Sequence, residues 1–191
     1  MKKLITILCA VLITICLSAQ TEQGTILIEG GSNLNYSSLK VNSIEIDGEA
    51  MDLDDVEATN TLGFKVTGGY FVMDGLAVGL LLDYSSESEG DYSSSSMTIG
   101  PIARYYIGES GMWAQLSYGI GSSSDKYDGE SEDGPSIGAL GIGVGYAIML
   151  SDNVSLSPSL GYTMITAKQE DVTVKAGGIV FGAGIAVHLG N

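Results

Sequence analysis

Histidine and cysteine are rare in this chain, and their positions do not form a catalytic set. His188 is the single histidine, and Leu189 and Gly190 follow it. A hydrolase with a His-x-Ser arrangement would need a serine at position 190, where the chain has glycine. Both cysteines, Cys9 and Cys16, lie in the apolar run at the start of the chain. We therefore expect a structural histidine, no enzymatic activity and no cofactor.

Carboxylates are abundant, and most of them gather in the polar stretches of the chain. There are 23 Asp and Glu against 8 Lys and Arg, which gives a net charge of −15. We expect no nucleic-acid partner, because phosphate neutralisation needs clustered Lys and Arg. The carboxylates of the polar stretches are Glu45, Asp47, Glu49, Asp52, Asp54, Asp55, Glu57, Glu87, Glu89, Asp91, Asp125, Asp128, Glu130, Glu132, Asp133, Glu170 and Asp171.

Such clusters could take up divalent cations, since Ca²⁺ binds several carboxylate oxygens. Neither the run 47–52 nor the run 125–130 has the spacing of an EF-hand loop. We favour a solvated, repulsive surface, and divalent cations at these acidic stretches are the alternative.

The first 19 residues have the pattern of a secretory signal peptide. Two lysines precede an apolar run over 4–17, and small residues follow at a cleavage point after Ala19. We expect residues 1–19 to be removed and residues 20–191 to form one exported domain without thiols.

After residue 20, apolar residues recur with a period of two, which is typical of strands. In one segment Leu140, Ile142 and Val144 alternate with glycines. Eight such segments lie at about 23–36, 59–73, 76–87, 95–107, 112–123, 136–150, 153–167 and 174–190. Their connections alternate between tight turns, as at Asp74, and longer polar stretches at about 37–58, 88–94, 124–135 and 168–173. This alternation predicts an all-β fold, an eight-stranded antiparallel up-and-down transmembrane β-barrel.

The two faces of the segments indicate which solvent surrounds the barrel. One face carries large apolar residues, and the other carries mainly Gly, Ala and Ser with few charges. Lipid requires the apolar face to point outward. The tyrosines at 36, 70, 84, 146 and 162 fall on this outward face near strand ends, as expected of an aromatic girdle at the headgroups.

The run Gly69-Tyr70-Phe71-Val72-Met73-Asp74-Gly75-Leu76-Ala77-Val78-Gly79-Leu80 resembles a recurrent hairpin of the bacterial outer-membrane β-barrel domain family, related to OmpX and the OmpA barrel. Gly161-Tyr162 and the glycine-rich last segment are similar to that family as well. The resemblance implies a Gram-negative outer-membrane protein in contact with lipid, and we expect a monomer.

The alternation places five polar side chains on the inward face: Glu29, Lys65, Asp83, Arg104 and Gln115. Lys65 and Asp83 lie equally far from the turn at Asp74, so they should be cross-strand neighbours. Arg104 and Gln115 have a similar relation across the next tight turn. Because a barrel of eight strands is just wide enough for side chains to fill it, we favour a polar network that closes the lumen. A gate or narrow ion path is the alternative.

These observations predict a non-enzymatic outer-membrane barrel with a structural or surface-interaction role through acidic extracellular loops. The alternative is a small porin-like channel for ions or small solutes. Trp113 falls on the inward face just after a tight turn, where it would help to close the barrel floor.

Overall fold

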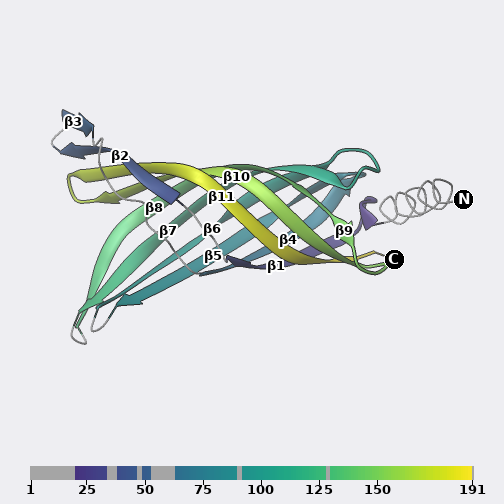
Figure 1. Ribbon diagram of the computed structural model, residues 1–191, viewed down its shortest axis with the longest axis horizontal. Coiled ribbons are helices and arrows are strands. Elements are labelled where there is room, and N and C mark those ends of the chain that lie inside the picture. Colours follow the sequence, from purple (N-terminus) through teal and green to yellow (C-terminus); the bar gives the residue numbers. More distant parts are fainter. Residues whose placement is uncertain are drawn as a thin grey trace, which may run out of the picture.

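Consecutive strands pair antiparallel around a complete ring (Figure 1). The computed structural model describes residues 20–33, 38–46, 49–52, 63–89, 92–127 and 130–190. The eight strands of the ring are β1 (Ile26–Asn33), β4 (Gly63–Met73), β5 (Leu76–Glu89), β6 (Tyr92–Tyr106), β7 (Met112–Tyr127), β8 (Glu130–Tyr146), β10 (Val154–Gln169) and β11 (Val172–Leu189). Among the described residues, no helix is long and apolar enough to cross a membrane.

The ring closes where the first strand meets the last. β1 pairs with β11 from Ile26↔Leu189 to Ser32↔Ala183, and it pairs with β4 on its other edge. Closure satisfies the backbone hydrogen-bonding groups of both edges, which a sheet in lipid requires. The predicted eight-stranded antiparallel barrel is confirmed, and each of the eight predicted segments overlaps one strand of the ring.

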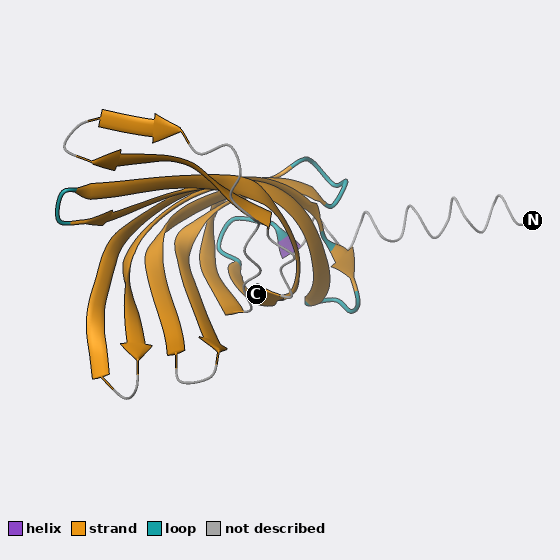
Figure 2. Ribbon diagram, turned by 60° about the vertical axis from the view of Figure 1, so that its left-hand side comes forward, coloured by secondary structure: helices purple, strands orange, loops and turns teal. Residues whose placement is uncertain are grey.

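Several stretches expected to be polar loops are strands instead. β2 (Ser38–Ile46) and β3 (Glu49–Asp52) form a hairpin in the first of these stretches. β2 also pairs with residues 172–179 of β11. β5 continues to Glu89 and β7 to Tyr127, so two of the other expected loops are mostly strand. Ser, Asp and Gly have low strand propensity, but pairing with a neighbouring strand overrides such preferences. Figure 2 shows these long hairpins extending beyond the ring.

The barrel has two unlike ends. We call one the turn end, because it carries the tight turns that join β4 to β5, β6 to β7, and β9 (Ile148–Met149) to β10. Gly75 has a φ of 77° in the first of these turns, a conformation that glycine adopts without strain. The described chain also begins and finishes at this end (Figure 1). The opposite end, with the β5–β6, β7–β8 and β10–β11 connections, is the hairpin end.

Large apolar side chains cover the outside of the ring. Leu80, Ile120 and Ile142 are 58%, 58% and 63% exposed, although they lie in the middle of long strands. Of the predicted girdle, Tyr70, Tyr146 and Tyr162 are exposed as well, whereas Tyr36 lies outside the described residues. The outward orientation of the apolar face is therefore as predicted, and it suits a lipid surrounding.

Candidate functional site

The lumen contains an arginine cluster formed by Glu29, Arg104, Gln115 and Trp113. The Arg104 guanidinium donates to both carboxylate oxygens of Glu29, with Nη1–Oε2 at 2.6 Å and Nη2–Oε1 at 3.1 Å. Its Nε donates to Gln115 Oε1 at 2.8 Å, and its Cζ lies 4.1 Å from the centre of the Trp113 ring. Arg104 is only 1% exposed. The cluster therefore joins β1, β6 and β7 across the inside of the barrel.

Only part of this cluster could be placed from the sequence. Arg104 and Gln115 are register partners on neighbouring strands, as the spacing around their turn predicted. Glu29 lies on β1, which is separated from β6 by β4 and β5 in the sheet order. A contact across the lumen depends on closure of the ring, so no spacing along the chain indicates it.

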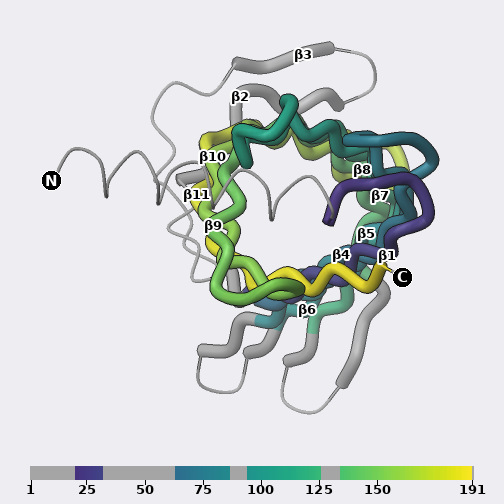
Figure 3. The backbone as a smooth tube through the Cα atoms, turned by 90° about the vertical axis from the view of Figure 1, so that its right-hand side faces the viewer, coloured from purple at the N-terminus to yellow at the C-terminus, as the bar shows by residue number. Residues whose placement is uncertain are grey.

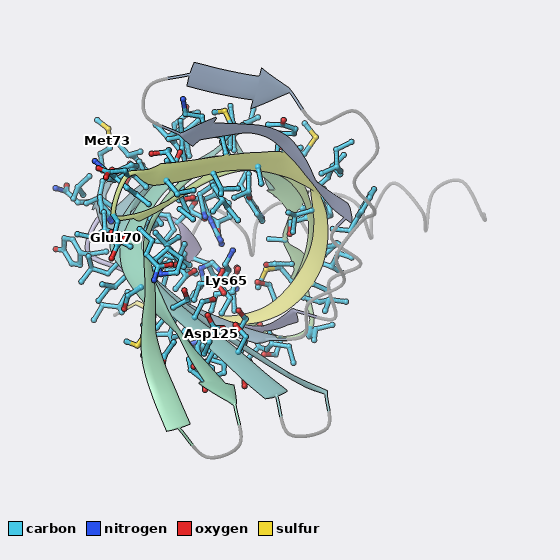
Figure 4. All side chains as sticks on the ribbon, turned by 90° about the vertical axis from the view of Figure 1, so that its left-hand side faces the viewer. Lys65, Met73, Asp125 and Glu170 are labelled. Atoms are coloured by element: carbon cyan, nitrogen blue, oxygen red, sulfur yellow. The ribbon has the colours of Figure 1, made fainter. Side chains whose placement is uncertain are left out.

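Lys65 and Asp83 form a second ion pair nearer the hairpin end. They are register partners on β4 and β5, and Lys65 Nζ lies 3.0 Å from Asp83 Oδ2. Their side chains are 36% and 29% exposed, so water screens this pair far more than the arginine cluster. Figure 4, viewed from the hairpin end, shows Lys65 inside the ring.

Between these two ion pairs the lumen holds a small polar cavity of about 100 Å³. Hydroxyl-bearing side chains line it together with the ion-pair residues, namely Thr67, Ser117, Ser159 and Thr163. Its opposite wall is largely glycine, at Gly141, Gly143 and Gly161. The cavity on the hairpin-end side of the arginine cluster is thus suited to water, because polar groups line it.

Towards the turn end, a floor cluster of buried apolar residues lies in the lumen: Leu27, Phe71, Ala77, Tyr106, Trp113, Ala147 and Ala186. The Phe71 and Tyr106 rings have centroids 5.6 Å apart, and the His188 ring lies 6.2 Å from that of Tyr106. Trp113 is 4% exposed and lies on the inward face, as predicted. Phe71 and Tyr106 were not predicted as part of this floor, although their inward phase in the alternation was available as a signal.

His188 is held on both ring nitrogens. Nδ1 lies 3.1 Å from the Gln20 carbonyl oxygen, and Nε2 lies 3.3 Å from Ser155 Oγ. Because a carbonyl can only accept, Nδ1 carries the proton and the Ser155 hydroxyl donates to Nε2. Ser155 is 0% exposed and His188 is 3% exposed. The pair has the atoms of a nucleophile and a base, but it is buried.

Residues 20–25 lie against the turn end of the barrel, and Figure 3 shows this segment at one side of the ring, reaching into its opening. Gln20 donates from Nε2 to the Asp152 carbonyl, and Thr21 accepts a hydrogen bond from the Gly75 amide at 2.8 Å. Gly24 donates to the Phe71 carbonyl at 3.0 Å. The strand predicted from about residue 23 begins at Ile26 instead. The residues just before it bond to turns and strand ends, so they do not extend the ladder of β1.

Most of the predicted acidic side chains lie outside the part of the molecule whose side chains are described. Asp125, Glu170 and Asp171 are within it, and Glu170 has a φ of 52° in the β10–β11 turn. In the described part, no group of three or more His, Cys, Asp or Glu is arranged to hold a metal ion. Cation binding at the acidic stretches therefore remains a prediction.

Comparison with known proteins agrees with this architecture. The chain matches the family model described as "Outer membrane protein beta-barrel domain" over residues 7–186. Among solved structures it is similar to Neisserial surface protein A, with 16% identity, coverage of 86% of this chain and 99% of that chain, and a TM-score of 0.53. OprG from Pseudomonas aeruginosa gives 14% identity, 90% and 99% coverage, and a TM-score of 0.48. Ail, the attachment invasion locus protein of Yersinia pestis, has 19% sequence identity to this chain and a TM-score of 0.44. The match covers 86% of this chain and 99% of that chain.

The family match covers nearly the whole chain, and the structure shows the closed ring with an apolar outer face that such a family requires. The likeness to Neisserial surface protein A supports the fold alone. The chain therefore belongs to the outer membrane protein β-barrel domain family and resides in the lipid of the outer membrane.

Proposed function

We propose that this protein is a closed, non-enzymatic barrel that serves a structural or surface-interaction role through acidic extracellular segments. The observation that carries the proposal is the arginine cluster, in which one buried guanidinium binds Glu29, Gln115 and Trp113. Long side chains fixed in this way occupy the lumen of a narrow barrel. The floor cluster and residues 20–25 lie on the turn-end side of the arginine cluster. Together these three layers favour a closed lumen over a channel.

We further propose that residues 1–19 are a removed signal peptide and that the turn end faces the periplasm. Barrels of this kind have short periplasmic turns and longer extracellular connections, which supports this orientation. The hairpin end would then carry most of the chain's carboxylates outside the cell. A net charge of −15 makes such a surface repulsive to other anions.

The buried state of the Ser155–His188 pair supports a non-enzymatic role. A hydrolase needs its nucleophile within reach of the substrate, but Ser155 has no exposed surface. Gln20 covers the histidine from the turn end through its carbonyl. The pair instead links β10 to β11 and to the start of the described chain.

Conductance of the purified protein without residues 1–19, in planar bilayers, tests the proposal. We expect no stable open channel, at most rare and small openings, because the arginine cluster crosses the lumen. Arg104→Ala removes the centre of that cluster, and Gly68→Leu, on the outward face of β4, is the matched control. Circular dichroism should show that both variants keep their strand content. Reproducible conductance steps of the unaltered protein, changed by Arg104→Ala and not by Gly68→Leu, would favour the porin-like alternative.

A further inference from the structure

The residue that follows the proposed cleavage point is Gln20, and the fold holds it in the turn end of the barrel. Its backbone carbonyl accepts a hydrogen bond from His188 Nδ1 at 3.1 Å, and its side-chain Nε2 donates to the Asp152 carbonyl. The next residue, Thr21, is fixed by the Gly75 amide, which donates to its carbonyl at 2.8 Å. Gln20 is only 7% exposed, so the start of the exported chain is anchored and largely buried.

Cleavage before Gln20 would turn its backbone nitrogen into a primary amine, which is mostly protonated and positively charged at neutral pH. This nitrogen is bonded to the same Cα as the anchored carbonyl carbon, so the charge would lie in the same buried place. Burial of a cation costs free energy unless a counter-charge pairs with it. Glu22, Asp74 and Asp152 lie at this end, but they are exposed, so water and salt screen their attraction. A charged glutamine at the start of the chain is therefore poorly suited to this position.

We propose that Gln20 is a modification site, at which the new α-amine closes onto the side chain of the same residue to give an N-terminal pyroglutamate. The neutral amine nitrogen forms a bond to Cδ, and the bond between Cδ and Nε2 breaks. One amine proton passes to Nε2, which leaves as ammonia, so no oxidant or other reactant is consumed. Because Gln20 is buried in the folded barrel, the ring closes before the barrel forms. The inference rests on the proposed removal of residues 1–19.

The neutral lactam suits the anchored position better than the open glutamine. In the open form Oε1 of Gln20 is buried without a hydrogen-bond partner, which is unfavourable. Loss of Nε2 removes the hydrogen bond to the Asp152 carbonyl, but Asp152 lies in an exposed turn, where water can donate instead. The backbone carbonyl of Gln20 is unchanged by ring closure, so the hydrogen bond from His188 is kept. Cyclisation therefore removes a buried charge and gives up one replaceable hydrogen bond.

The first test identifies the start of the protein purified from the outer membrane of its own organism. Top-down mass spectrometry should find a chain that begins at position 20 and is lighter than the unmodified sequence by one ammonia, with fragments that assign the loss to Gln20. A synthetic peptide of residues 20–33 with a free amine passes through the same steps and should be cyclised far less. A chain that begins at Gln20 without the loss, or with no more loss than the peptide, would overturn the inference and leave the signal-peptide proposal standing. A chain that begins at another residue would overturn both.

A second test asks whether burial of the charge is the physical reason. The chain 20–191 is released from an amino-terminal fusion, and half of it is treated with a glutaminyl cyclase before both halves are refolded into phospholipid vesicles. We expect the unfolding equilibrium constant of the cyclised half, measured in urea, to be about tenfold smaller. Gln20→Asn, whose shorter side chain cannot form the five-membered lactam, should give the same constant with and without the enzyme. Equal constants for the two halves of the unaltered chain would refute the argument from burial. Neither test depends on whether the lumen is closed.

Discussion

Removal of the Glu29 charge should destabilise the barrel more than any change to the Lys65–Asp83 pair. Glu29→Gln keeps the shape of the side chain but leaves the Arg104 cation without a counter-charge. Removing one partner of a buried pair costs about 3–5 kcal/mol. Arg104 is 1% exposed and Glu29 is 15% exposed, so this range applies, and we expect about 3 kcal/mol because Gln115 and the Trp113 ring still contact the guanidinium.

The measurement is a double-mutant cycle on unfolding by urea in phospholipid vesicles. Glu29→Gln, Arg104→Met and the double variant give the coupling free energy between the two side chains, which we expect to be about 2 kcal/mol. Trp113 is the single tryptophan and reports unfolding by its fluorescence. Because Arg104 lies against that ring, far-ultraviolet circular dichroism serves as a second probe.

The matched cycle uses Lys65→Met and Asp83→Leu. That pair is 36% and 29% exposed, with Lys65 Nζ 3.0 Å from Asp83 Oδ2, so its coupling should be only about 0.5–1 kcal/mol. Equal coupling in the two cycles would refute the argument, because it would mean that burial does not decide the strength of lumenal ion pairs here. Strictly additive effects of Glu29→Gln and Arg104→Met would refute the ion pair itself.

Two further predictions concern the wall and the orientation of the barrel. Gly100→Ala should prevent folding or lower the free energy of unfolding by several kcal/mol, since its Cβ would overlap the Tyr118 carbonyl of β7. Gly68→Ala has open space around its Cβ, so it should change the free energy of unfolding by less than about 1 kcal/mol in the same urea assay. Protease added to intact cells should spare the turns at Asp74 and Asp152 and cut only in the segments expected outside, near 37–58 or 124–135. Cleavage at either turn, mapped by mass spectrometry of the fragments, would contradict the proposed orientation.

The sequence by itself determined the number of strands in the ring, their order and the face that the residues of the predicted segments take. These properties follow from a period of two and from turn residues, which are local along the chain. The cross-strand pairs Lys65–Asp83 and Arg104–Gln115 were predictable for the same reason, because a tight turn fixes the register of the two strands that it joins. The lengths of the long hairpins were not predictable, since residues such as Ser and Asp form strands only when a partner strand is present.

Only the tertiary structure decided which side chains meet across the lumen. Glu29 reaches Arg104 because the ring closes through β1 and β11, and residues 20–25 lie at the turn end because they bond to the turns at Gly75 and Asp152. Each of these features joins residues far apart in the chain, and their contacts depend on the curvature of the closed sheet, which no periodicity along the sequence encodes.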